Sequence, residues 1–200
     1  IGNDSPFSLT PSVNAFSLTR AFPAYQTGAY VQATRDVGPR VNLTIGGRFD
    51  DYRFGGDRRF SPRAGASVAV SPRLSWRASY GRYYQQPFFL FLAAFPQNAA
   101  LVPLRADHVV TGLSYELSRR TRVTVEAYRK TYGDYPVSTG FPSLSLANVG
   151  DTFNVRDVLF PMTSAGRGRA QGLEFLAERK SGGRWYGQVN LAVSSARHAG

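Results

Sequence analysis

The sequence predicts an all-β fold: a transmembrane antiparallel up-and-down β-barrel, present as a partial set of about eight strands of a larger barrel. Three observations predict it. Seven segments alternate apolar and polar residues one by one, short connections alternate with long ones, and aromatic residues gather near strand ends. A strict alternation gives each strand one apolar and one polar face, as in a barrel with lipid outside and a polar lumen inside.

The first two expected strands show the weakest and the clearest signal. The weak one covers about Gly28–Asp36, and the clear one covers Val41–Asp51. In the second segment Leu43, Ile45 and Phe49 share one parity, while polar residues occupy the other. We therefore expect the first parity to face lipid and the second to face the lumen.

Six later segments repeat the same alternation. Their apolar residues fall on one parity, and Gly, Ser, Thr or charged residues fall on the other, although Val110 is out of place in its segment. Extended to their turns, most reach the 9 to 11 residues that a tilted crossing needs. The expected strands lie at 63–70, 74–81, 108–117, 123–128, 172–178 and 185–194.

The connections predict the topology. Short and long ones alternate strictly, so all short turns should lie at one end of the sheet, which is the periplasmic end in bacterial outer-membrane barrels. Most short ones contain residues that favour tight reversals. The expected short turns are 37–40, 71–73, 118–121 and 181–184, and the expected long loops are 53–59, 85–106 and 133–167.

The aromatic residues support a membrane crossing. Trp76 and Trp185 each follow a short turn on the apolar parity, whereas Tyr80 and Tyr84 lie toward a long loop. We expect these four to form girdles at the two lipid interfaces, because their rings combine an apolar body with a polar edge. Further aromatic residues expected in the belt near the long loops are Phe49, Tyr52, Tyr83, Tyr128 and Tyr132.

Composition excludes several classes of protein. The chain has no cysteine, which rules out disulfides and thiolate metal sites. No apolar run approaches the ~20 residues of a membrane helix, so any crossing must use strands. The net charge of +11 comes mostly from dispersed arginines, which argues against nucleic acid as a partner. We expect both ends of the 200 residues to be fragment edges.

Five segments resemble the β-barrel of TonB-dependent outer-membrane receptors. Leu104 departs from that pattern, because the family usually carries a glutamate at this place. The resemblance runs from about Tyr25 to the end of the chain. The segments that carry it are 42–50 (NLTIGGRFD), 60–65 (FSPRAG), 76–84 (WRASYGRYY), 101–107 (LVPLRAD) and 168–175 (GRAQGLEF).

The resemblance implies energy-coupled uptake of a bulky, scarce ligand, such as a siderophore, cobalamin, an oligosaccharide or a peptide. It implies location in the outer membrane of a Gram-negative bacterium, with membrane lipid, a plug domain and the TonB complex as partners. We expect residues 1–200 to form a partial barrel domain, with the plug domain and the remaining strands absent from the chain. The family's larger barrels enclose a plugged lumen.

Ligand-binding candidates come from the long loops, where an exposed apolar patch usually marks a binding surface. These are Phe88, Phe89, Phe91, Phe95, Tyr132, Tyr135 and Phe153. Packing of the phenylalanines into the wall or over the plug remains an alternative. Polar-parity charges are expected to line the lumen or contact the plug, namely Arg48, Arg63, Arg77, Glu126 and Glu174.

No catalytic or cofactor site is expected, so the chain is interpreted as a transporter and not an enzyme. The two histidines, His108 and His198, are far apart, and His108 is expected at the barrel rim. A cation held by Asp50, Asp51 and Asp57 is only a weak hypothesis. Two alternatives remain: a small autonomous eight-stranded outer-membrane barrel with a structural or adhesion role, and a soluble β-sandwich that binds carbohydrate.

Overall fold

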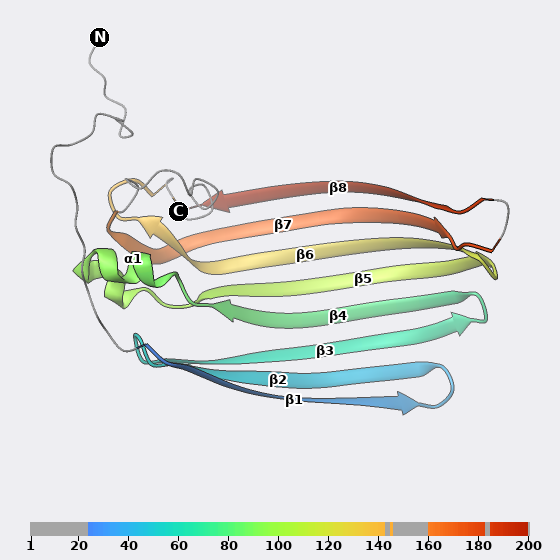
Figure 1. Cartoon of the computed structure of the whole chain (residues 1–200), viewed down its shortest axis with the longest axis horizontal. Helices are drawn as coiled ribbons and strands as arrows, with labels where there is room; N and C mark the ends of the chain where they lie inside the picture. Colours follow the sequence, from blue (N-terminus) through green and yellow to red (C-terminus); the bar gives the residue numbers. More distant parts are fainter. Residues whose placement is uncertain (1–23, 143–144, 146–159, 183–184, 200) are drawn as a thin grey trace, which may run out of the picture.

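The computed structural model describes residues 24–142, 145, 160–182 and 185–199, which form one eight-stranded sheet with a short helical insertion (Figure 1). The helical elements are α1, Phe89–Ala94, and the 3₁₀ helix η1, Pro96–Ala100. The strands are β1 Gln26–Val37, β2 Val41–Tyr52, β3 Asp57–Ser71, β4 Leu74–Gln85, β5 Leu104–Ser118, β6 Thr121–Ser138, β7 Met162–Arg179 and β8 Gly187–Ala199.

Every strand pairs antiparallel with its neighbour in sequence, in the order β1 to β8. The described part of the sheet is open, because β1 pairs only with β2 and β8 only with β7. This arrangement confirms the predicted partial barrel. It does not favour a complete eight-stranded barrel, whose first and last strands would pair, nor a sandwich, which needs two sheets.

Two of the tight turns have the same construction. The Ser71 hydroxyl accepts hydrogen bonds from the backbone N–H groups of Arg73 and Leu74, at 3.3 and 3.1 Å. The Ser118 hydroxyl likewise accepts hydrogen bonds from the backbone N–H groups of Arg120 and Thr121. In both hairpins the strand register shifts just before the turn. We call this end of the sheet the turn end, and the opposite end the loop end.

One expected loop is wrong in length. β2 continues to Tyr52 and β3 begins at Asp57, so residues 53–56 form a turn instead of a loop over 53–59. Gly55 and Gly56 adopt φ values of +88° and +70°, which let the chain reverse within this turn. The strands β6 and β7 also extend past Gly133 and Arg167, to Ser138 and Met162, which shortens the expected loop over 133–167.

The paired rows show that one face of the sheet is apolar. A single row across all eight strands contains only apolar side chains, and a second row towards the loop end is nearly as apolar. We call this the outer face and its opposite the inner face. The first row is Val37, Val41, Val68, Trp76, Leu113, Val125, Phe175 and Leu191.

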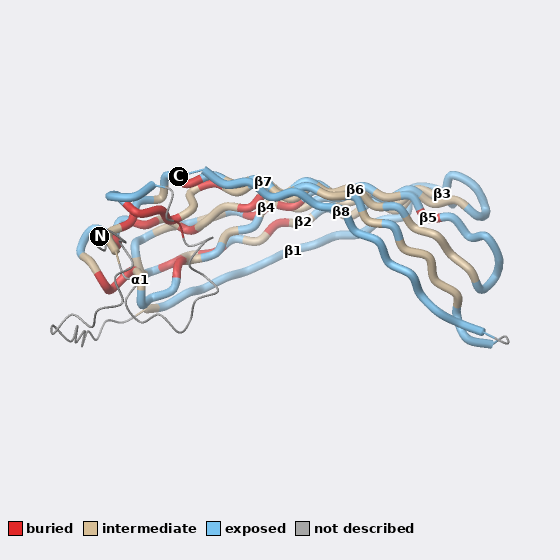
Figure 2. The backbone as a smooth tube through the Cα atoms, turned by 90° about the horizontal axis from the view of Figure 1, so that it is seen from above, coloured by how far each residue is buried: buried red, intermediate tan, exposed pale blue. Residues whose placement is uncertain are grey.

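The outer face is exposed, although its side chains are large and hydrophobic. Ile45 is 69% exposed, and Leu191 on the edge strand is 62% exposed. In the view from above, buried residues concentrate at the end near α1, and the edge strands β1 and β8 are exposed (Figure 2). Exposed apolar surface of this extent indicates a lipid-facing or partner-covered surface.

The buried core lies at the loop end, between connections. Leu92 of α1, Leu101 and Met162 form its centre, and Phe54, Phe91 and Phe160 pack against them. Asn98 of η1 is fully buried and joins these segments. Its side-chain N–H groups donate to the carbonyls of Phe91 and Phe160, and its oxygen accepts from the Met162 N–H at 2.7 Å. We call this assembly the loop cap.

Candidate functional site

The inner face carries ladders of polar side chains across neighbouring strands. The Thr34 and Thr44 hydroxyls lie 3.0 Å apart, and those of Ser114 and Thr124 lie 3.1 Å apart. Near the turn end, Arg122 contacts two carboxylates on the flanking strands, Glu116 and Glu178. Cross-strand polar pairs of this kind hold register and keep the inner face hydrophilic.

An aromatic row crosses the inner face toward the loop end. The ring of His108 on β5 lies 4.9 Å from that of Tyr83 on β4 and 6.4 Å from that of Tyr132 on β6, between ring centroids. Tyr135 continues the row 6.3 Å from Tyr132. The guanidinium of Arg63 lies over the Tyr83 ring at 5.9 Å. These five side chains, which we call the aromatic row, present several ring faces beside a cation.

Local backbone features build the aromatic row. Gly81 makes room for the Tyr83 side chain on the inner face, because a Cβ at position 81 would lie 2.6 Å from the Tyr83 hydroxyl. Asp134 has φ +59°, and the register shifts between Tyr132 and Tyr135. This bulge brings two tyrosines separated by three positions onto neighbouring sites of one face.

The aromatic row combines two residues predicted as ligand-binding, Tyr132 and Tyr135, with residues that sequence reasoning placed elsewhere. Tyr83 and Tyr132 were expected in a lipid-facing belt, but the row places them on the inner face; Tyr128 shares that face. His108, expected at the rim, lies between two of the rings. Parity is the signal that could have found them: Tyr83 shares it with Arg77 and Ser79, and His108 shares it with Gly112 and Ser114.

The predicted loop phenylalanines separate into two groups. Phe88 and Phe89 are 61% and 45% exposed, whereas Phe91 packs against the core of the loop cap and Phe95 is half-buried. Phe89 meets the ring of Phe54 edge to face at 5.9 Å. Phe153 lies outside the described residues. The loop therefore offers an exposed apolar surface at two of the predicted positions.

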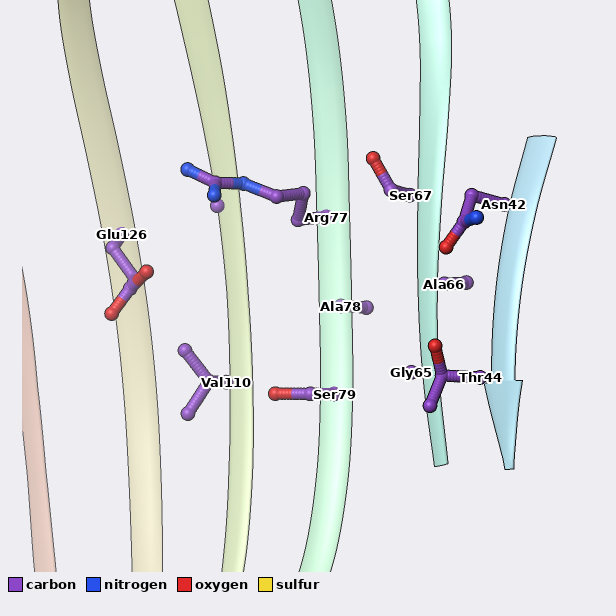
Figure 3. Close-up of a pocket in the computed structure, with 11 residues that line it drawn as sticks. Asn42, Thr44, Gly65, Ala66, Ser67, Arg77, Ala78, Ser79, Val110 and Glu126 are labelled. Carbon is purple, nitrogen blue, oxygen red and sulfur yellow. The ribbon is translucent and has the colours of Figure 1, made fainter. Parts of the chain in front are cut away.

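A shallow hollow of about 290 Å³ lies on the inner face toward the turn end (Figure 3). Arg77 extends from β4 across β5 toward Glu126 on β6. Gly112 lies between them in the paired row and leaves the space open. Glu126 is directly opposite Glu174 on β7, and neither carboxylate forms an ion pair among the described residues. Two unpaired carboxylates side by side favour a cationic partner.

The remaining predicted lumen charge, Arg48, has a partner within the sheet. Its guanidinium donates to both oxygens of Asp50, at 2.7 to 3.0 Å, and Asp50 is only 3% exposed. Asp51 is paired with Arg53 and Arg58, and Asp57 with Arg59. The carboxylates considered for a cation are thus occupied by arginines. No three acidic or imidazole groups cluster in the described part of the chain.

The predicted girdle residues occupy the outer face to different degrees. Trp185 is 63% exposed, and the guanidinium of Arg179 lies 4.3 Å from its ring centroid. Trp76 donates to the Thr111 hydroxyl at 2.9 Å, and Tyr80 donates to Asp107. Tyr84 is half-buried and lies under the guanidinium of Arg59. No helix among the described residues is long and apolar enough to span a membrane.

The model of one protein family, TonB dependent receptor-like, beta-barrel, matches residues 2–198. No curated protein sequence matches the chain. The siderophore receptor PirA from Pseudomonas aeruginosa is 17% identical with a TM-score of 0.68, over 86% of this chain and 32% of that one. The ferripyoverdine receptor of the same organism, bound to ferripyoverdine, is 20% identical with a TM-score of 0.65, over 86% and 23%.

A third similar structure is the alcaligin outer-membrane receptor FauA from Bordetella pertussis. It is 17% identical with a TM-score of 0.61, over 86% of this chain and 30% of that one. The chain thus spans between 23% and 32% of these three structures. At these identities the likeness shows the fold.

Proposed function

This chain belongs to the family of TonB-dependent receptor-like β-barrels, and we propose that it forms part of the wall of a receptor that imports a bulky ligand. The receptor would reside in the outer membrane of a Gram-negative bacterium, with the outer face against lipid and the loop end outside the cell. Uptake would be energised through the TonB complex. This is a transport function and not an enzymatic one.

We propose a ferric siderophore as the ligand, and the aromatic row is the observation that carries this choice. Two cations lie beside it: Arg63 over the Tyr83 ring, and Lys130, which is directly opposite His108 and has its ammonium over the neighbouring Tyr128 ring. A bulky, anionic ligand with flat groups would gain both stacking and charge interactions there. The similar structures include a siderophore receptor, a ferripyoverdine receptor and an alcaligin receptor, which supports a ferric siderophore as the ligand class.

The hollow beside Arg77 supports a second role for the inner face, which is contact with a plug domain. Glu126 and Glu174 are adjacent, unpaired carboxylates, so a basic plug segment is the partner that they favour. Gly112 leaves space for such a segment between β4 and β6. We propose that Arg48 and Arg63 contribute to the wall around plug and ligand rather than to chemistry.

Ligand binding by the full polypeptide that contains this chain tests the proposal. We would titrate the purified protein with ferripyoverdine and a panel of other ferric siderophores, following quenching of intrinsic fluorescence. Tyr132→Ala should raise the dissociation constant of the bound siderophore about tenfold, equivalent to ~1.4 kcal/mol. The matched control is Tyr115→Ala, which removes an exposed tyrosine from the outer face and should leave affinity unchanged.

Two results would count against the proposal. Equal losses in the Tyr132 and Tyr115 variants would show that the aromatic row is not the binding surface. Absence of binding to every ferric siderophore would exclude that ligand class. Energy coupling has its own measurement: uptake of labelled iron complex by cells should stop when TonB is deleted, and continued uptake would contradict it.

A further inference from the structure

Arginines gather on the outer face beyond the apolar rows, toward the loop end. The row that contains Ile45, Tyr80 and Val109 on β2 to β5 reaches Arg129 on β6. Two residues closer to the loop end, the same face of β7 and β8 carries Arg169 directly opposite Arg197. We call this set the outer arginine belt. It comprises Arg82, Arg105, Arg129, Arg167, Arg169 and Arg197.

The charge of the outer arginine belt is only partly compensated. Its one carboxylate, Asp107, is held by Arg82 at 2.7 Å, with Arg105 at 3.6 Å. Arg129, Arg167 and Arg197 are exposed and form no ion pair among the described residues. Arg169, also exposed, donates to the Gln171 side chain at 3.0 Å. Four guanidinium groups on β6 to β8 are therefore available to an anionic partner.

The neighbouring residues restrict what that partner can be. On β7 and β8 one polar pair, Gln171 opposite Ser195, separates the arginines from the apolar residues of the same face. Those apolar residues are Leu173 opposite Val193 and Phe175 opposite Leu191. A ligand that matches this surface has several negative charges at one end and apolar chains at the other. Guanidinium groups bind phosphate in a bidentate manner, which a strongly hydrated ammonium cannot do. A nucleic acid would match the arginines but not the apolar rows.

We propose that the outer arginine belt binds the phosphate groups of a phosphorylated glycolipid in the outer leaflet, with its acyl chains on the apolar rows. This inference rests on the proposed function, because it requires the loop end to face the cell exterior. The belt then lies at the depth of the lipid headgroups. Each arginine near an anionic membrane surface adds to the attraction, so binding depends on several of them together.

The test compares two triple variants of the full polypeptide, purified in detergent. The belt variant is Arg129→Gln/Arg169→Gln/Arg197→Gln. The control, Arg40→Gln/Arg73→Gln/Arg119→Gln, removes the same charge from exposed positions at the turn end. Each protein is titrated with fluorescent bisphosphorylated lipid A and with the same glycolipid after phosphatase treatment.

We expect the belt variant to bind bisphosphorylated lipid A at least about tenfold more weakly than the unaltered protein. The control variant should bind it within about twofold, and the dephosphorylated glycolipid should bind all three proteins equally weakly. Unchanged affinity in the belt variant would overturn the inference. Equal losses in both variants would overturn it too, because they would indicate non-specific charge attraction.

Two parallel measurements separate this inference from the proposed function. Membrane fractionation reports whether the protein is in the outer membrane, and siderophore titration reports whether the aromatic row binds ligand. If the protein is not in the outer membrane, the proposed function and this inference fail together. If location and siderophore binding are intact but phosphorylation of the glycolipid has no effect, only this inference fails.

Discussion

At the residue scale, the pair Arg48–Asp50 shows how the inner face tolerates a buried carboxylate. Asp50 is nearly inaccessible, and the Arg48 guanidinium satisfies both of its oxygens. Gly28 on the edge strand is directly opposite Asp50 and leaves the room for this pair. A Cβ at Gly28 would lie 2.4 Å from the guanidinium and 2.6 Å from the carboxylate.

Replacing Arg48 should destabilise the fold, because the buried Asp50 carboxylate would lose the group that neutralises it. We expect Arg48→Met to lower the urea concentration at the unfolding midpoint of the barrel, because Asp50 would lose its charged partner where water has little access. The measurement is urea-dependent unfolding of the full polypeptide in detergent micelles. Arg119→Met, at an exposed turn, is the matched control. An unfolding midpoint that is lowered no more in the Arg48 variant than in the Arg119 variant would contradict the assignment.

At the scale of elements, alternation alone located all eight strands, because a period of two survives in each lipid-facing strand. Alternation did not predict the places where the chain departs from a regular strand. The turn after Tyr52 depends on two glycines with positive φ, and the bulge at Asp134 moves Tyr135 to the inner face. Tyr132 and Tyr135 were predicted as ligand-binding residues, but Tyr83 and His108, which complete the aromatic row with Arg63, were missed for a related reason. Nearness to a strand end was taken as the sign of a lipid belt, although parity decides which face a ring occupies.

The loop cap provides a test at the same scale. Asn98 joins η1, α1 and the start of β7 through three hydrogen bonds. Asn98→Ala would leave the Met162 N–H and two carbonyls without partners, so the cap should open more often. We expect hydrogen exchange within residues 86–103 to speed up by about tenfold or more. Gln97→Ala changes an exposed neighbour and should not alter exchange, and equal rates in both variants would contradict this role for Asn98.

At the scale of the whole molecule, the two open edges determine what the described strands can do alone. β1 and β8 each present an unpaired row of backbone groups. Such edges bind further strands, whether of the same polypeptide or of other copies. We therefore propose that further strands pair with both edges of the described sheet; the chain spans 23% and 32% of two of the similar structures.

Residues 24–199 expressed alone should for this reason associate through their edges. We expect light scattering and gel filtration in detergent to show higher oligomers rather than a monomer. The full polypeptide, in contrast, should run as one species whose gel mobility changes on heating, as closed barrels do. A stable monomer of residues 24–199 with protected edge amides would contradict the requirement for further strands.

On the outer face, the boundary between the apolar residues and the charged positions also indicates how the strands are tilted. The last apolar residue before the charged positions is Phe49 on β2, Val109 on β5 and Val193 on β8, so across the paired rows the boundary moves toward the turn end from β2 to β8. The slide amounts to about one residue per strand, which matches strands tilted by ~35–45°. If every further strand adds the same offset, the shear accumulated on closure is about equal to the number of strands. A stretch of eight strands thus already sets the strand tilt of the complete cylinder, and the number of strands alone then decides its diameter.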